Sequence, residues 1–335
     1  MGKFIRVFLF SLVCFSLAAF AGITAYSKIF DTKPLPIPQD QVDKLDLDGD
    51  DPFDKLVLEG KRLNTLVVGV NDNMTDTIML ASFNVETKQV DIISIPRDTY
   101  HHRKGYNGAA QKKINAIYSS QGIETLIVNI QEVLGSKIPI HHYAVVKYEG
   151  VEKMVDLVGG VKVNIPMNMK YDDPYDKPPL KIRISKGEQV LKGKEAIQFL
   201  RYRKPNKGER GGYPDGDIGR IKAQQDFVKS FIKKSIGLKL PNIIKTGVEH
   251  IETDIKMSQG VSYASRLAGI DSENINMIML PGIDKYIKGT SYYIHDEDAT
   301  RELIRDIYAN RYISEEDLEK KLNEEIDKGK QRKDD

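Results

Sequence analysis

From Arg62 onward the chain alternates short apolar runs with turn-forming residues, and this alternation limits the possible fold more than any other feature of the sequence. Leu63–Val70, Thr77–Val85 and Gln89–Ile95 have the length and the apolar content of buried strands. Longer segments with the apolar spacing of helices follow. Because strands and helices alternate, we predict an α/β (mixed α+β) fold in which a central mixed β-sheet is flanked by helices on both faces.

The remaining elements are predicted from the same periodicities and from the glycines that end helices. The predicted helices are Ile114–Ser120, Ile123–Leu134, Glu149–Val158, Ile218–Ile236, Gln259–Leu267 and Asp296–Ala309. The predicted strands are Ile140–Val146, Val161–Ile165 and Ile275–Leu280. No internal repeat interrupts this order, so the segment is predicted to be one domain.

Residues 195–225 carry the most unusual arrangement of charge in the chain. If the segment around Arg201 and Arg203 is extended, both side chains lie on one face. Arg220 and Gln224 are four residues apart on a predicted helix and are therefore neighbours. The planar guanidinium group suits phosphate oxygens. The stretch predicts an anion site, and a solvated basic face is the alternative.

Composition limits the class of protein. The 335 residues are enough for one large or two ordinary domains, and a net charge of +2 argues against a nucleic-acid binder. The single cysteine, Cys14, excludes an internal disulfide and a thiolate metal site.

The N-terminal segment contains an uncharged run, Val7–Ser27, that is preceded by Lys3 and Arg6. Its length is close to the ~20 residues that span a bilayer. The preceding positive charge predicts a cytoplasmic tail over residues 1–6, a single transmembrane anchor over 7–27 and an extracellular C-terminal domain. A cleaved signal peptide is the alternative, because Ala19–Ala21 has the small-x-small pattern of a cleavage site.

The segments outside the predicted domain differ from it in composition. Residues 28–60 are predicted to be an extended linker, since prolines recur there and the acidic run Asp43–Asp54 is typical of a solvated segment without core residues. Residues 61–312 form the predicted catalytic domain. Residues 313–335 are mostly Lys, Glu and Asp and are predicted to be a charged tail.

A series of motifs between about residues 62 and 310 resembles the LytR-CpsA-Psr family. They are Gly69 with Asp76-Thr77, Ile95-Pro96-Arg97-Asp98-Thr99, Lys113-Ile114-Asn115, His142-Tyr143, Val155-Asp156-Leu157-Val158-Gly159-Gly160-Val161, Arg201-Tyr202-Arg203 and Asp217-Ile218-Gly219-Arg220. Their order makes the resemblance specific, whereas one short motif would be weak. The resemblance implies a membrane-anchored extracytoplasmic phosphotransferase. Such an enzyme moves an anionic or phosphate-linked glycopolymer, such as teichoic acid or capsule polysaccharide, from undecaprenyl diphosphate to a sugar hydroxyl of peptidoglycan.

The resemblance also implies roles for particular residues. The residues that match the diphosphate-binding positions are Arg97, Arg201, Arg203, Arg220 and Gln224. Asp76 matches one of two aspartates associated with Mg²⁺. The other falls at Asn71, where the family usually has aspartate, and Asp72 follows directly and is the expected substitute.

The chemistry of phosphoryl transfer agrees with this set of residues, because it needs fixed positive charge around the phosphate oxygens. Asp98 is expected to orient an arginine through an ion pair, and Asp217 to act either as a helix cap or as the general base. The adjacent histidines, residues 101–102 and 141–142, are expected to be solvated or at the core edge and not to bind metal.

An apolar groove for the polyprenyl chain is expected between the sheet and the helices. Ile127, Ile130, Val133 and Leu157 are the candidates for its lining, and their spacing suits plain core equally well.

Two other functions are compatible with the sequence. A hydrolase or pyrophosphatase acting on the same lipid diphosphate would use the same arginines with water as the acceptor. A transcriptional regulator is disfavoured, since about six residues precede the predicted span. The polymer, the acceptor sugar and the oligomeric state are left open by the sequence.

Overall fold

The computed structural model of the protein describes residues 45, 47, 49–71, 74–135, 137–176, 179–208, 211–214, 217–235, 250–267 and 270–312. The predicted anchor, most of the predicted linker and the charged tail lie outside these residues. Within the described ranges, no helix combines the length and the apolar character needed to cross a bilayer.

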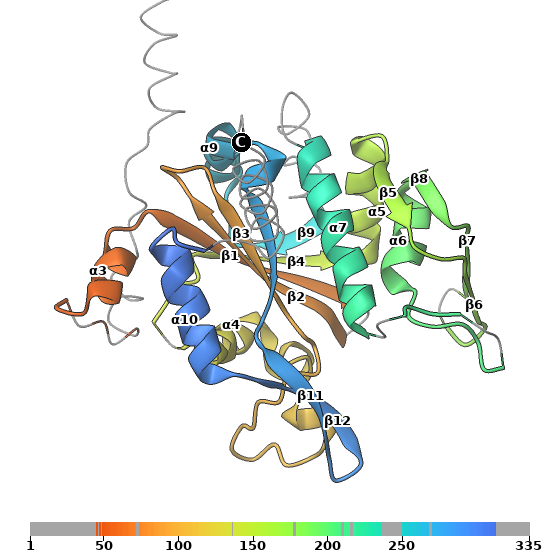
Figure 1. Ribbon diagram of the computed structural model, residues 1–335, viewed down its shortest axis with the longest axis horizontal. Coiled ribbons are helices and arrows are strands. Elements are labelled where there is room, and N and C mark those ends of the chain that lie inside the picture. The colour runs from red at the N-terminus through yellow and green to blue at the C-terminus, as the bar shows by residue number, and fades with distance from the viewer. Residues whose placement is uncertain are drawn as a thin grey trace, which may run out of the picture.

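The centre of the molecule is a six-stranded mixed sheet (Figure 1). Its spatial order is β10 (Ile275–Met279), β3 (Val90–Ile95), β2 (Met74–Asn84), β1 (Arg62–Asn71), β4 (His142–Lys147) and β9 (Ile251–Thr253). The β10–β3 and β1–β4 pairs are parallel and the other three pairs are antiparallel. The prediction of a central mixed sheet is confirmed.

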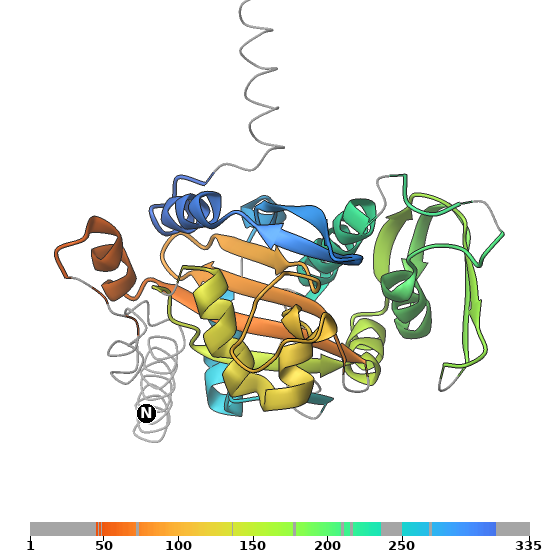
Figure 2. The same ribbon diagram turned by 90° about the horizontal axis from the view of Figure 1, so that it is seen from below.

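The two faces of the sheet are covered by different helices. Leu66, Val68 and Leu80 point to one face and pack with α4 (Ala116–Val133), α10 (Glu297–Tyr308) and α3 (Pro52–Leu58). The helix α4 lies across the sheet in Figure 2. Met79 and Ile92 point to the other face, toward α7 (Asp217–Ser235) and α9 (Met257–Leu267). Helices on both faces were predicted from the alternation of elements, and this prediction is also confirmed.

Residues 148–201 form a lateral lobe beside the sheet, at the right of Figure 1. It contains α5 (Tyr148–Leu157), β5 (Val161–Ile165), β6 (Met169–Asp173), β7 (Leu180–Ile184), β8 (Gly187–Leu191) and α6 (Gly193–Arg201). Strand β5 pairs with β8 and β6 pairs with β7. Ile182, Phe199 and Tyr202 are fully buried in a core that the lobe shares with α7.

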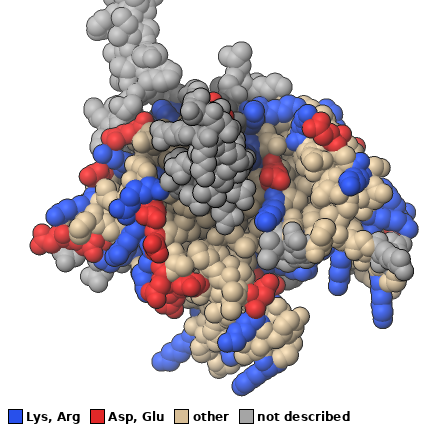
Figure 3. Space-filling model, viewed as in Figure 1, with Lys and Arg blue, Asp and Glu red and all other residues tan. Residues whose placement is uncertain are grey.

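The outward side of the lateral lobe carries exposed lysines. Residues 148–201 as a whole contain ten Lys and Arg against eight Asp and Glu. Lys162, Lys170 and Lys181 are exposed on its strands because their neighbours in sequence face the core. Lysine and arginine side chains gather over this side of the molecule in Figure 3.

Two elements near the ends of the predicted domain were not predicted. A hairpin of β11 (Gly282–Ile287) and β12 (Thr290–His295) projects from the sheet next to β10 (Figure 1). Helix α3 lies inside the predicted linker. Its Asp54 is fully buried and forms an ion pair with Lys137 at 2.8 Å, so the prediction of a solvated acidic segment is wrong here.

The segment around Arg201 differs from the extended conformation considered for it. Arg201 is the last residue of α6, and the chain becomes extended only at Tyr202 (φ −66°, ψ 128°). The Glu195 carboxylate accepts the Lys192 backbone N–H at 2.7 Å, which satisfies a donor at the start of the helix. The two arginines therefore do not share the face of one strand, and a helix end followed by an extended turn brings them to the same pocket.

Candidate functional site

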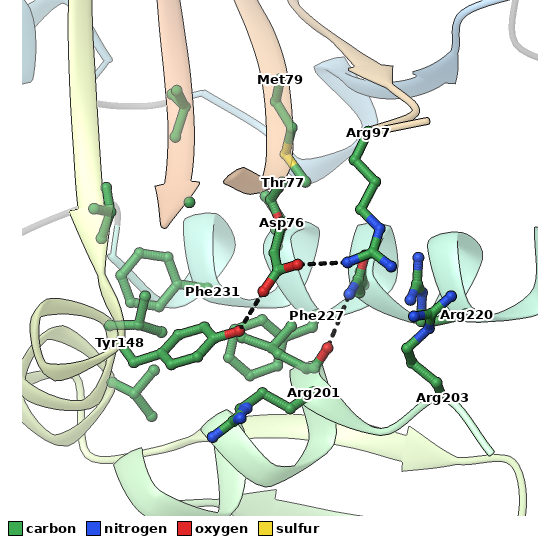
Figure 4. Close-up of a pocket in the computed structure, with 18 of the residues that line it drawn as sticks. Asp76, Thr77, Met79, Arg97, Tyr148, Arg201, Arg203, Arg220, Phe227 and Phe231 are labelled. Carbon is green, nitrogen blue, oxygen red and sulfur yellow. Dashed lines mark hydrogen bonds and ion pairs between the residues drawn. The ribbon is translucent and has the colours of Figure 1, made fainter. Parts of the chain in front are cut away.

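A pocket of about 850 Å³ lies between the α7 side of the sheet and helices α5, α6 and α7 (Figure 4). The sheet contributes small or flexible side chains, among them Val67, Gly69 and Met79. The absence of a side chain at Gly69 matters for packing within the sheet, since a Cβ there would approach Thr77 Cβ to 3.1 Å. The pocket has a charged end and an apolar end.

Four arginines line the charged end. Arg97 follows the last residue of β3 after a single proline, Arg201 ends α6, Arg203 lies two residues later, and Arg220 is in the first turn of α7. The sequence predicted that these four side chains act together, and the structure brings all of them to one pocket. Arg220 is buried, whereas Arg203 is exposed. Their roles toward a ligand remain predictions.

Asp76 is the carboxylate at the centre of this end (Figure 4). Its Oδ1 is 2.5 Å from Nη1 of Arg97, and its Oδ2 accepts a hydrogen bond from the Tyr148 hydroxyl at 3.0 Å. Burial raises the pKa of Tyr148, and the negative charge of Asp76 raises it further. The Tyr148 hydroxyl therefore stays protonated and remains a hydrogen-bond donor.

Arg201 is held by two neighbours. Its Nη1 is 2.9 Å from Oδ2 of Asp176, which follows β6, and its Cζ lies 5.0 Å from the centre of the Tyr148 ring. Burial acts to lower the pKa of Arg201, but the hydrogen bond with Asp176 and the nearby carboxylates outweigh it, so the pKa is raised. Arg201 is permanently charged, and an internal carboxylate partly neutralises it in the ligand-free protein.

The apolar end is formed largely by one stripe of α7. Arg220, Gln224, Phe227 and Phe231 follow one another at spacings of four, three and four residues, which places them on one side of the helix. Figure 4 shows Arg220 at the charged end and the two phenylalanines beyond it. The stripe therefore passes from a guanidinium through an amide to aromatic rings. This pattern is readable from the sequence, which makes it the signal by which Phe227 and Phe231 could have been found.

Gln224 has a structural partner. Its Nε2 donates to the backbone carbonyl of Leu200 at 2.9 Å, and this bond fixes α7 to the last turn of α6, next to Arg201. The side-chain oxygen is separate from that bond, so a role in ligand binding stays a prediction.

For the four residues named as candidates for the apolar lining, the structure shows the alternative, which is plain core. Ile127, Ile130 and Val133 belong to the core on the opposite face of the sheet, so they do not line the apolar end. Leu157 packs against the core of the lateral lobe, outside the pocket lining. Ile127, Ile130 and Val133 lie on α4, which covers the other face of the sheet, whereas Leu157 lies on α5 and points away from the pocket that this helix helps to form.

The structure differs in what it shows for the three aspartates near the motifs. Asp98 forms its ion pair with Lys113 at 3.0 Å, so the expectation that it orients an arginine is not met. Asp217 is the first residue of α7, as expected for a residue at a helix start, but its side chain is not among those described. Asp72 lies outside the described residues.

The donor chemistry of the charged end fits a magnesium ion in part. Mg²⁺ is commonly held by one or two carboxylates together with substrate phosphates. Asp76 offers a carboxylate whose two oxygens have about four lone-pair positions, so each oxygen can accept a ligand beyond its present partner. Among the described residues no group of three or more His, Cys, Asp or Glu side chains is placed to hold a metal. A site here would depend on Asp76 and on oxygens from a phosphate ligand, with Asp72 as the further candidate.

The paired histidines lie away from the pocket. His101 is 3.1 Å from Glu132 and His142 is 3.1 Å from Asp254. Burial of His141 lowers its pKa to about 4. His102 is exposed and the other three are partly buried, as expected for histidines that are solvated or at the core edge.

Comparison with known proteins gives one family. The model of the LytR_cpsA_psr family matches residues 22–308. The polyisoprenyl-teichoic acid–peptidoglycan teichoic acid transferase TagV of Bacillus subtilis (strain 168) is 27% identical over 254 residues, covering 72% of this chain and 62% of TagV. The chain thus spans less than two thirds of the length of TagV.

Two further similarities support the same grouping. The transferase TagU, from the same strain and with the same descriptive name as TagV, is 27% identical over 253 residues, covering 73% of this chain and 76% of TagU. The crystal structure of B. subtilis TagV has a TM-score of 0.61 at 25% identity, and the superposition covers 76% of this chain and 99% of that one.

Proposed function

Because the chain belongs to the LytR_cpsA_psr family, we propose that it is a transferase that attaches a glycopolymer to peptidoglycan. The proposal is supported by the names of its relatives TagV and TagU, which are teichoic acid–peptidoglycan transferases. The donor in this proposal is an undecaprenyl-diphosphate-linked polymer that is anionic or phosphate-linked. The enzyme is anchored by Val7–Ser27 and acts on the outer side of the membrane.

The observation that carries the proposal is the stripe on α7 that runs from Arg220 to Phe231. A polyprenyl diphosphate has the same polarity along its length, with a highly charged head and an apolar chain. One pocket that changes from four arginines to aromatic and aliphatic side chains is complementary to such a molecule at both ends.

The chemistry follows from the charged end. The acceptor hydroxyl oxygen forms a bond to the phosphorus that carries the polymer, while the bond from that phosphorus to the bridging oxygen breaks and undecaprenyl phosphate leaves. The hydroxyl proton passes to a base, for which Asp217 is the sequence-derived candidate. Arg97, Arg201, Arg203 and Arg220 hold the phosphate oxygens and stabilise the charge that develops on the leaving group. Bound Mg²⁺, held by Asp76 with Asp72 as a second ligand, would supply further charge compensation.

The test is a reconstitution of the full chain with an undecaprenyl-diphosphate-linked polymer and peptidoglycan. We expect label from the polymer to become covalently attached to peptidoglycan, and Arg220→Ala to abolish most of this attachment. Lys222→Ala is the matched control, because it removes a positive charge from an exposed position of the same helix, outside the pocket. Release of the polymer as a free phosphate, with none attached, would identify a hydrolase and refute the proposal.

A further inference from the structure

Tyr148 occupies the boundary between the charged and the apolar ends of the pocket. It is the first residue of α5, directly after β4, and it lines the pocket together with Val151 and Met154 of the same helix. Figure 4 shows its ring between Asp76 on one side and Arg201 on the other, with Phe227 close by. The side chain thus contacts both an acidic and a basic group of the charged end.

The two contacts of Tyr148 use different parts of the side chain. The hydroxyl donates to Oδ2 of Asp76 at 3.0 Å, and the ring centre lies 5.0 Å from Cζ of Arg201. Substitution by phenylalanine therefore removes only the hydroxyl group, whereas substitution by leucine removes both the hydroxyl group and the aromatic ring.

Each contact adds a restraint to a group that is otherwise held by one ion pair, Asp76 by Arg97 and Arg201 by Asp176. Arg97 holds only one oxygen of Asp76, so without the Tyr148 hydroxyl the carboxylate can rotate to face Arg97 with both oxygens. That rotation would neutralise Arg97 more completely and weaken its pull on a phosphate. The Arg201 guanidinium lies over the ring, and this cation–π contact favours one position of the guanidinium group.

We propose that Tyr148 is a positioning residue for the diphosphate, whose hydroxyl sets the Asp76 carboxylate and whose ring sets the Arg201 guanidinium. The inference rests on the proposed function, since the diphosphate is the ligand that the arginines are proposed to hold. It adds a residue that acts through its neighbours and does not itself touch the reacting atoms.

The first experiment measures the affinity of the full chain for farnesyl diphosphate by calorimetry, with EDTA present so that bound metal does not contribute. We expect Tyr148→Phe to weaken binding by about three- to ten-fold, a part of what a hydrogen bond to a charged group contributes. Tyr148→Leu should weaken it by about a further three-fold or more, because the contact with Arg201 is lost as well. Tyr118→Phe is the matched control, since its hydroxyl contacts Glu252 at 3.4 Å, outside the pocket.

The second experiment separates positioning from direct contact. In an Asp76→Ala background, which leaves the Tyr148 hydroxyl no side-chain acceptor at this position, Tyr148→Phe should cause almost no additional loss, because the hydroxyl acts through the carboxylate. Losses that multiply in the double variant, or wild-type affinity in Tyr148→Phe, would overturn the inference. If the wild-type protein binds neither farnesyl diphosphate nor inorganic pyrophosphate, the proposed function fails and this inference fails with it. If the wild type binds the ligand, Arg220→Ala does not, and Tyr148→Phe binds as tightly as the wild type, the role of Tyr148 is refuted while the proposed function stands.

Discussion

Replacing Arg201 by alanine removes the guanidinium that is held between Asp176 and the Tyr148 ring. In the ligand complex this group is proposed to bind phosphate oxygens, and a hydrogen bond to a charged partner contributes about 1.5–3 kcal/mol. At about 1.4 kcal/mol per factor of ten, the loss corresponds to roughly ten- to 150-fold weaker binding. Its side chain is only 17% exposed, so screening by solvent reduces this value little.

Lysine at the same position should restore only part of the affinity. A point charge cannot form two parallel hydrogen bonds with a phosphate, and it does not stack on Tyr148 as a planar group does. We expect Arg201→Lys to fall between alanine and wild type. The assay is calorimetric titration with farnesyl diphosphate, combined with the shift in Tm that the ligand causes.

Asp176→Asn provides the opposite perturbation. It removes the carboxylate that competes with a phosphate for Arg201. The affinity for diphosphate should therefore rise, by about two- to five-fold if the ion pair contributes up to about 1 kcal/mol. Normal ligand binding by a folded Arg201→Ala protein, together with a lower Tm of its ligand-free form, would refute the reasoning and make Arg201 a structural residue.

Three further predictions concern other parts of the chain. Asp76→Ala should weaken Mg²⁺-dependent transfer. Asp72→Ala should do so only if Asp72 replaces the missing second aspartate, and full activity of the Asp72→Ala protein in a magnesium titration would exclude that replacement. The run Val7–Ser27 predicts that protease added to intact cells removes a C-terminal tag, and a protected tag would contradict the topology. His141 has a pKa of about 4 when folded and near 6.5 when unfolded, so the unfolded state binds more protons between these values and stability should fall as pH drops from about 6.5 to 4. For His141→Gln, the free energy of unfolding measured by chemical denaturation should change less with pH over this range. A pH dependence equal to that of the wild type would exclude His141 as the cause.

The central sheet could be predicted because its strands are strongly apolar. Strands β1 and β3 are almost continuously buried, and runs of Val and Ile of that length are typical of strands covered on both faces. In the lateral lobe β5 was predicted, because its apolar and polar residues alternate without interruption. Strands β6 and β7 are as short and have one exposed face, which carries Lys170 and Lys181, and they were not predicted. Such segments give too weak a periodic signal to be separated from loops.

The local sequence before Arg201 does not decide between a helix and a strand. Ala196, Phe199 and Leu200 have the i, i+3, i+4 spacing of a helix, whereas Ile197 and Phe199 have the two-residue spacing of a strand, so this short run is ambiguous. The bond between Glu195 and the backbone of Lys192 favours the helix, and so does the packing of Phe199 in the lobe core. Packing of this kind involves residues that are distant in sequence.

The charged residues of the site could be predicted from the sequence, but the residues that line its apolar end could not. The four arginines could be identified because their motifs carry them, whereas the lining of the apolar end depends on which face of a doubly covered sheet the pocket occupies. Leu66 and Val67 are adjacent in β1 and point to opposite faces, and only Val67 lines the pocket. Nothing in the local sequence distinguishes these faces. Asp176 was missed for a related reason, since it reaches Arg201 from a hairpin that was itself not predicted.

The arginines of the charged end come from three elements that are far apart along the chain: the end of β3, the end of α6 and the start of α7. A ligand that contacts all of them can stay bound only while these elements are in place together. By linkage, bound diphosphate should make local opening of each element rarer, and amide hydrogens in the last turn of α6 and the first turn of α7 should exchange more slowly as a group. The substrate would then act as a temporary cross-link that joins the lateral lobe to the sheet for as long as the complex lasts.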